Sequence, residues 1–427
     1  MNSTSTKSRG IAPLYNRDFR LLIVGFAMGQ MLMPLQFFTQ ILWVQEYAPK
    51  NVWLILVALI GASRGVGALT FGLYGGALAD RFDRRWLLLV TQILLILTTL
   101  VISAVLYFSD GSALTFILFF AVTFISAGLH SIDAPTRLAL VPDILGPSLT
   151  PAGLSLNQVA GQLAMPVALF GTGFIIEGLG FSGAYLFSVI GNLIMIVCLA
   201  LMTHRSTKRE NNPERNSYGF MDTIKDVRYG LKYARHHSVV FWTIMLLVCM
   251  MGLGFPATAN LGPTWLTTVV GVKISHVGIV AMNWGIGSLI AALLLTYFSS
   301  VERRGALIAG GAILFSLSFM IFVIDHKVVN AVIGNLGLGA GVTITTVSST
   351  ILIQHIVPNE VRGRIMSILQ LNMGFAQLMT MPVAILGQWL TLPVLFPILA
   401  ALTVTVVGMI LITQPQLIKA RLDNSHQ

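Results

Sequence analysis

Charge and cysteine are both scarce in this 427-residue sequence. Its 26 Lys and Arg and its 16 Asp and Glu together make up 10% of the chain, whereas an ordinary soluble domain has about 25%. A soluble fold of this size could not cover its surface with so few charges, so the composition excludes a water-soluble enzyme. Two cysteines are too few for a disulfide-stapled secreted protein. Hydrophobic residues make up 55% and the mean hydropathy is +0.82, which indicates that lipid surrounds most of the chain.

The sequence also lacks the motifs of common catalytic and nucleotide-driven machinery. It contains no Gly-x-x-x-x-Gly-Lys loop, so we expect no ATP drive within this chain. It contains no H-E-x-x-H, no C-x-x-C and no His/Cys cluster, which argues against a metal enzyme. We therefore expect a protein that is not an enzyme and that uses no cofactor and no metal. No basic patch with interleaved aromatic residues points to nucleic acid.

Apolar segments long enough to cross a bilayer recur along the whole chain. A hydrocarbon core of about 30 Å needs about 20 apolar residues in a helix. The expected spans lie near 19–44, 52–79, 86–108, 113–134, 152–177, 181–203, 239–265, 277–300, 305–324, 328–354, 365–388 and 391–413. This pattern predicts an all-α membrane protein with twelve transmembrane helices.

The longest polar stretch, 204–238, separates these spans into two sets of six. It ends in a basic amphipathic run over 222–235. We predict an N-terminal six-helix half at 1–203, a cytoplasmic linker at 204–238 and a C-terminal six-helix half at 239–427. Transporters built from two such repeats bind their substrate near the midplane and rock one repeat against the other.

Two short motifs recur at nearly the same distance in the two halves. Val141-Pro142-Asp143 returns 216 residues later as Val357-Pro358-Asn359, and Arg84-Arg85 returns 219 residues later as Arg303-Arg304. Both offsets are close to half of the chain length. They favour a duplicated six-helix unit.

The distribution of Lys and Arg predicts which ends of the spans face the cytoplasm. With both termini inside, 22 of the 26 basic residues fall in cytoplasmic segments, and Lys50, Lys273 and Lys327 fall outside. Positive charge marks cytoplasmic loops, so we predict two cytoplasmic termini. The basic loops and the net charge of +10 also suit contact with anionic membrane lipid. Apart from Arg20 at the start of the first span, Arg64 is the one Lys or Arg within a predicted span.

A motif between the second and third spans resembles a known family. The chain there reads Gly76-Ala77-Leu78-Ala79-Asp80-Arg81-Phe82-Asp83-Arg84-Arg85. This resembles the signature loop of the major facilitator superfamily, G-x-x-x-D-R-x-G-R-[RK]. The departure is Asp83, where the family usually has Gly.

The resemblance implies a gating role for this motif. Its members here are Gly76, Asp80, Arg81, Arg84 and Arg85. By resemblance, Asp80 meets the start of the eleventh helix near 364–367 and latches the outward-facing state. A carboxylate at a helix N-terminus is favoured by the unpaired N–H groups and the helix dipole, and the arginines can pair with acids on adjacent helices. The other interpretation is that these charges only set topology.

A second stretch is similar to one branch of that superfamily. Helix four runs through Asp133, Pro135, Arg137 and Val141-Pro142, and Asn157 follows in the fifth span. This looks like the bacterial exporter branch that contains the enterobactin exporter and several twelve-helix drug antiporters. Asp133 and Arg137 are therefore candidates for the gating machinery as well.

Four charged or titratable residues are candidates for substrate binding or proton coupling. Arg64 lies roughly 18 Å into its helix, where an arginine is costly unless it faces a partner or a cavity. We expect either a structural partner or an anionic substrate. His130, Asp133 and Arg137 share one helical face, so Asp133 either pairs with a nearby arginine or couples protons together with His130. Glu177 is either a solvated cap or a coupling carboxylate.

Side-chain amides within the spans are further candidates for the substrate cavity. Each can also act as a hydrogen-bonding link between helices. The candidates are Gln30, Gln36, Asn157, Gln162, Asn372 and Gln377.

These features together predict a secondary active transporter in the cell (inner) membrane. We expect it to export a small siderophore-like or drug-like molecule by alternating access, with protons moving inward, as a monomer. The alternative is a proton-coupled importer or symporter of a metabolite. The pH dependence and the direction of flux would separate the two.

Overall fold

The computed structural model describes residues 11–109, 111–203, 220–298 and 301–421, without some side chains of three helices. Within these ranges the chain is helical and contains no strand. It forms two compact units. Unit 1 comprises Met1–Lys50 and Ala62–Ser217, and unit 2 comprises Asn51–Gly61 and Tyr218–Gln427.

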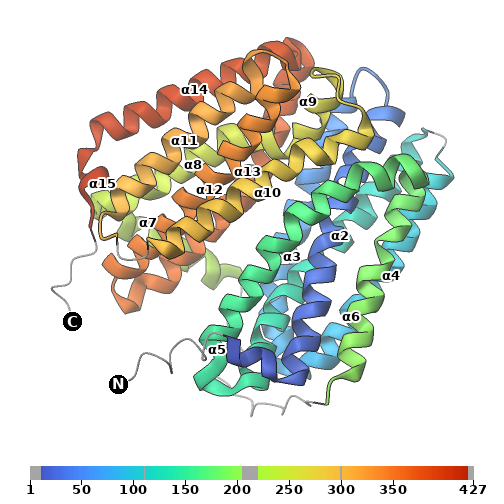
Figure 1. Ribbon diagram of the computed structural model, residues 1–427, viewed down its shortest axis with the longest axis horizontal. Coiled ribbons are helices and arrows are strands. Elements are labelled where there is room, and N and C mark those ends of the chain that lie inside the picture. Colours follow the sequence, from blue (N-terminus) through green and yellow to red (C-terminus); the bar gives the residue numbers. More distant parts are fainter. Residues whose placement is uncertain (1–10, 110, 204–219, 299–300, 422–427) are drawn as a thin grey trace. The chain divides into compact units, whose positions relative to one another are not determined.

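Unit 1 is a bundle of long helices (Figure 1). After the short turn η1 (Ala12–Tyr15) it contains α2 (Arg17–Tyr47), most of α3 (Trp53–Arg81), α4 (Arg84–Tyr107), α5 (Ala113–Phe187) and α6 (Val189–Leu201). Helices α2 and α4 both pack against α5 and α6. Phe19, Leu88, Leu140 and Leu199 are buried where these four helices meet.

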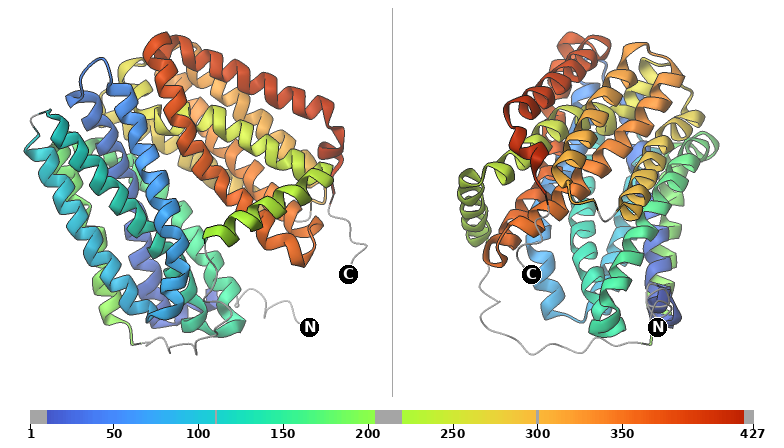
Figure 2. Two further views of the ribbon diagram at one scale, coloured as in Figure 1. Left: turned by 180° about the vertical axis from the view of Figure 1, so that it is seen from behind. Right: turned by 60° about the vertical axis from the view of Figure 1, so that its left-hand side comes forward.

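Unit 2 is built mainly from α8 and α10 to α14. Its elements in chain order are α7 (Phe220–His236), α8 (Ser238–Phe255), η3 (Pro256–Asn260), α9 (Gly262–Thr268), α10 (Ile274–Tyr297), α11 (Arg304–Ile324), α12 (Val328–Ile356), α13 (Asn359–Leu390), α14 (Leu392–Thr413) and α15 (Pro415–Lys419). Helix α12 lies beside both α11 and α10. The three helices can be followed in both views of Figure 2.

Glycine sets the closest approach in unit 2. A Cβ atom added at Gly287 would collide with the Leu336 carbonyl, and one added at Gly339 would collide with the Trp284 carbonyl. The backbones of α10 and α12 are therefore in direct contact, as small residues allow between membrane helices.

The basic run predicted over 222–235 lies within α7. This helix packs on α13, where the guanidinium of Arg364 lies 4.6 Å from the centre of the Tyr229 ring. Ala234 is fully buried in a cluster with Val240 and Ile365. The rest of the predicted linker, 204–219, lies outside the described residues.

Polarity is inverted on α4, with polar groups inside and apolar groups outside. Gln92 and Thr99 are 6% and 2% exposed, whereas Ile93 and Leu97 are 50% and 51% exposed. A soluble helix shows the opposite arrangement. The outer face of α4 is therefore suited to lipid.

Nine helices in the described part of the chain are long and apolar enough to cross a membrane. The predicted spans 113–134 and 152–177 both lie in α5, whose backbone departs from helical geometry at Gly146 (φ 70°) and Gly180 (φ 68°). The predicted span 365–388 lies in α13, which is not one of the nine. The number of twelve spans and the cytoplasmic termini stay predictions.

Candidate functional site

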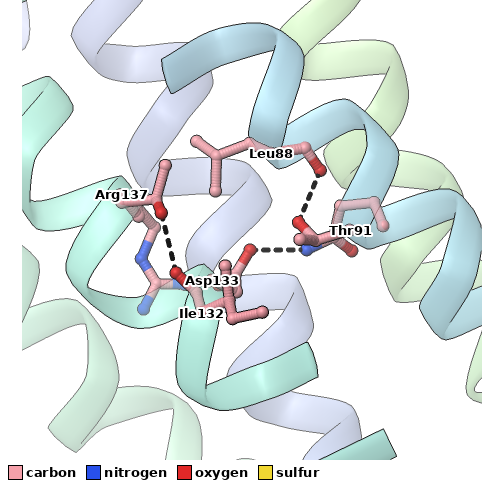
Figure 3. A network of polar contacts seen from close by, with 7 residues as sticks. Leu88, Thr91, Ile132, Asp133 and Arg137 are labelled. Carbon is pink, nitrogen blue, oxygen red and sulfur yellow. Dashed lines mark hydrogen bonds and ion pairs between the residues drawn. The ribbon is translucent and has the colours of Figure 1, made fainter. Parts of the chain in front are cut away.

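A buried carboxylate joins α4 and α5 in unit 1. Asp133 is 5% exposed. Its Oδ2 forms an ion pair with Nη1 of Arg137 at 3.0 Å, one turn along the same helix (Figure 3). Its Oδ1 accepts a hydrogen bond from Nε2 of Gln92 on α4 at 2.8 Å. We call these three residues the Asp133 cluster.

The cation of this cluster also contacts α2. The Arg137 guanidinium lies 4.0 Å from the centre of the Phe26 ring, a stacking geometry that attracts a cation. His130 interacts electrostatically with Asp133, Arg137 and Arg64. The expected pairing of Asp133 with a nearby arginine is thus present, with Arg137 as the partner. Its role in gating or proton coupling stays a prediction.

Arg64 lies on α3. Its guanidinium is 5.0 Å from the centre of the Phe37 ring of α2, and it interacts electrostatically with Tyr185 of α5. The side chain is half-buried. Among the residues that the structure describes, no carboxylate forms an ion pair with Arg64.

Two glutamines of α2 bond to polar groups of neighbouring helices. Gln36 donates to Ser188 Oγ at 2.6 Å and to Thr99 Oγ1 at 3.4 Å. Gln40 donates to the hydroxyl of Tyr185 at 3.0 Å, and its own Oε1 is buried without a partner among the described atoms. Gln36 therefore links helices, which is the alternative that the sequence left open for it.

The other amide candidates of unit 1 differ in their surroundings. Gln30 and Gln162 are half-buried and Asn157 is 7% exposed. Within the described ranges, the side chains of Gln30 and Asn157 have no hydrogen-bond partner. Both amides remain able to bind a ligand.

The signature motif is anchored at the start of α4. Asp83 Oδ1 accepts a hydrogen bond from the backbone N–H of Trp86 at 2.8 Å, so it caps the helix. The departure from glycine at this position is therefore a helix cap. For Gly76, Asp80 and Arg81 the structure describes the helical backbone alone.

The two arginines that follow bind different helices. Nη1 of Arg84 donates to the carbonyl of Ala139 at 2.8 Å and to both carboxylate oxygens of Asp143, at 2.9 and 2.7 Å. Arg85 donates to the carbonyl oxygens of Leu199 and Ala200, where α6 ends and its carbonyls lack helical partners. The predicted pairing with an acid of an adjacent helix is present for Arg84.

Unit 2 contains an uncharged polar cluster at an irregular turn. The π-helical segment η3 ends at Asn260, whose Nδ2 donates to Thr380 Oγ1 at 2.6 Å and to Gln377 Oε1 at 3.4 Å. Such turns often occur at functional sites. Asn372, on the same helix as Gln377, is 7% exposed and its Oδ1 is buried without a partner among the described atoms.

Glu177 near the end of α5 is exposed. In the described part of the chain it forms no hydrogen bond or ion pair. The described residues also include no group of three or more His, Cys, Asp or Glu that could hold a metal ion.

The polar residues of these clusters that were not predicted as site residues include Gln92, Tyr185 and Asn260. Gln92 had a usable signal, because it is the single amide within the span 86–108. Tyr185 and Asn260 had none, since their partners lie far along the chain.

Comparison with known proteins identifies the family. A family model described as Major Facilitator Superfamily matches residues 21–381. The chain belongs to this superfamily. It is therefore a multi-pass membrane protein whose family and fold are those of small-molecule transporters, not of enzymes.

One similar protein has a substrate in its name. Over 324 residues the chain is 22% identical to the Staphyloferrin A transporter of Staphylococcus aureus (strain NCTC 8325 / PS 47), covering 76% of this chain and 79% of that protein. The relative is a siderophore transporter.

Solved structures share the fold at low identity. A POT family transporter in complex with a thioalcohol-conjugated peptide has a TM-score of 0.72 at 12% identity, covering 94% and 96% of the two chains. A mutant of the nucleoside transporter NupG has a TM-score of 0.73 at 12% identity, covering 94% and 100% of the two chains. A D-xylose-proton symporter has a TM-score of 0.66 at 14% identity, covering 93% and 97%.

Proposed function

We propose that this superfamily member exports a small anionic, siderophore-like molecule across the cell (inner) membrane by alternating access, with protons moving inward. The observation that carries the proposal is Arg64. It is a half-buried cation in an apolar helix, stacked on Phe37 and without a carboxylate partner among the described residues.

The energetics of Arg64 favour an anionic ligand. Placing an arginine at the centre of a membrane helix costs about 2.5–3.5 kcal/mol, and stacking on an aromatic ring returns about 0.5–2 kcal/mol. The Phe37 ring contacts the guanidinium, and the N–H donors of Arg64 have no hydrogen-bond partner in the described part of the chain. A carboxylate or catecholate oxygen would offset the remaining cost, because bonds to charged groups contribute about 1.5–3 kcal/mol.

The similarity to a siderophore transporter favours this substrate class over cationic drugs. A siderophore offers anionic oxygens that Arg64 can bind, whereas a cationic drug does not. Gln30, Asn157 and Gln162 of unit 1 then supply uncharged hydrogen bonds to the rest of the molecule. Asn372 and Gln377 of unit 2 stay candidates for substrate binding.

Proton coupling is assigned to the Asp133 cluster. Asp133 is a buried carboxylate beside His130 and Arg137, and buried acids near a titratable neighbour are the usual relays of transporters. Glu177 is the second candidate, and its exposure makes it accessible to protons from solution. Asp80, Arg81, Arg84 and Arg85 form the gating motif of the proposed cycle.

The experiment is efflux from cells stripped of their own exporters, with wild type, Arg64→Ala and Arg64→Lys. The compounds are a catecholate siderophore, a carboxylate siderophore and a cationic dye, each with and without a proton uncoupler. We expect uncoupler-sensitive export of a siderophore that falls more than tenfold in Arg64→Ala, as the loss of about 1.5–3 kcal/mol requires. Arg64→Lys keeps the charge and should retain part of the activity.

Two results would contradict the proposal. Export of the dye at the same rate in wild type and Arg64→Ala would make Arg64 a structural residue and the protein a drug antiporter. Uptake of a siderophore or metabolite driven by inward protons would establish the import alternative.

A further inference from the structure

Gln92 binds Asp133 from a different helix than Arg137 does. Arg137 lies four residues from Asp133 on the same helix, whereas Gln92 reaches Asp133 from α4. Gln92 is 6% exposed and its Nε2 lies 2.8 Å from Oδ1. The bond between Gln92 and Asp133 therefore contributes to holding α4 against α5.

The two partners of Asp133 differ in what they can accept. A guanidinium has five donors and no acceptor, so Arg137 can bond the carboxylate but not the proton of a carboxylic acid. A primary amide has both donors and an acceptor. When a proton adds to Oδ1 of Asp133, rotation of the Gln92 amide brings its Oε1 into position to accept that proton in a hydrogen bond. The proton comes from hydronium in the aqueous phase, whose O–H bond breaks as the new O–H bond of Asp133 forms, leaving water.

We propose that Gln92 is a positioning residue that keeps Asp133 hydrogen-bonded in both protonation states, so that proton uptake opens the Asp133–Arg137 ion pair while the α4–α5 contact stays closed. This rests on the proposed role of Asp133 in proton coupling. After the pair opens, Arg137 is held by Phe26 alone among its described partners, since its Nε is buried without one.

The charged groups around Asp133 do not take over the hydrogen bond that Gln92 makes. On α5 they are His130 and Arg137, and on α3 the described one is Arg64. On α4, Arg84 and Arg85 bind Asp143 and the α6 carbonyls. On α2, the uncharged ring of Phe26 contacts Arg137. Gln92 is thus the polar partner that is matched to a change of charge at Asp133.

The test measures protonation of Asp133 directly, in the full-length protein reconstituted in lipid nanodiscs. Infrared difference spectra against pH follow the C=O band of the protonated carboxyl, which Asp133→Asn assigns by abolishing it. Gln92 binds the charged carboxylate more strongly than the neutral acid, so in Gln92→Met the midpoint should move upward by the difference between the two bonds, about one pH unit. Gln92→Asn, whose amide is one methylene shorter, should move it less in the same direction.

The matched control is Gln36→Met, which also removes a buried amide of unit 1 but bonds only to hydroxyl groups. It should leave the Asp133 midpoint unchanged. An unchanged midpoint in both Gln92 variants would overturn the proposal, as would an equal shift in Gln36→Met. The readout is independent of transport. A shifted band together with uncoupler-insensitive export would refute proton antiport and leave the role of Gln92 standing.

Discussion

Arg84 shows how much of a family motif can be structural. Its Nη1 reaches the Ala139 carbonyl and both oxygens of Asp143, and the two side chains are 11% and 26% exposed. Replacing Arg84 by Met should destabilise the protein by about 2 kcal/mol, below the 3–5 kcal/mol of a fully buried pair because Asp143 keeps contact with solvent. The measurement is the apparent melting temperature of the purified protein in detergent.

The same substitution at Lys327 is the control. Lys327 donates to Asp325 at 2.8 Å, and this hydrogen bond lowers the pKa of the Asp325 carboxyl, but the two side chains are 70% and 51% exposed. Exposed pairs contribute little to stability, so Lys327→Met should have the same apparent melting temperature as wild type. If the apparent melting temperature of Arg84→Met also equalled that of wild type, the contacts of Arg84 would not stabilise the fold.

At this scale the sequence predicts charges better than their neutral partners. Arg64 was predicted because it interrupts an apolar run. Asp133 was predicted to pair with Arg81, Arg84 or Arg137, and Arg137 is its partner. Gln92 was not predicted, since an amide in a span is compatible with many roles and its partner lies 41 residues away. The departure from the family pattern at Asp83 predicted a tighter or differently capped turn, and Asp83 caps α4.

Helix α5 tests how glycine shapes a whole element. Gly180 has φ 68° and ψ 176°, a region that is essentially restricted to glycine. A Cβ there would have no atom within 4 Å, so the cost of Gly180→Ala comes from the backbone alone. We expect a loss of about 1–3 kcal/mol, seen as a lower apparent melting temperature.

Gly178 provides a control two residues away. It is helical, and a Cβ there also has no neighbour within 4 Å. Gly178→Ala should be neutral or stabilise by up to about 1 kcal/mol, because alanine has the higher helix propensity. Equal destabilisation by both substitutions would mean that the backbone geometry at Gly180 does not explain the effect.

Hydropathy located the elements but not the irregularities within them. The predicted spans 113–134, 152–177 and 181–203 all fall on helix, and the glycines at 146 and 180 separate them. The predicted span 239–265 contains the π-helical turn at Pro256–Asn260. Hydropathy cannot detect this turn, because it changes the hydrogen-bond pattern of the backbone and not its composition.

For the whole molecule, membership of the superfamily follows from features that extend along the chain. Two sets of spans, recurring motifs and a basic signature loop all pointed to it, and the family model covers 21–381. Orientation rests on a single pattern, the excess of Lys and Arg on one side. It therefore calls for a direct test.

Two single-cysteine variants would test orientation most sharply, Lys327→Cys and Arg303→Cys, each made after Cys198 and Cys249 are replaced by Ala. Both positions lie in described loops and are exposed, so a maleimide reagent can reach either one from its own side. The charge pattern places position 327 outside and position 303 inside. A membrane-impermeant maleimide should label Lys327→Cys in intact cells and Arg303→Cys only after the membrane is opened. The reverse pattern would invert the topology, and with it the direction in which the proposed exporter moves its substrate.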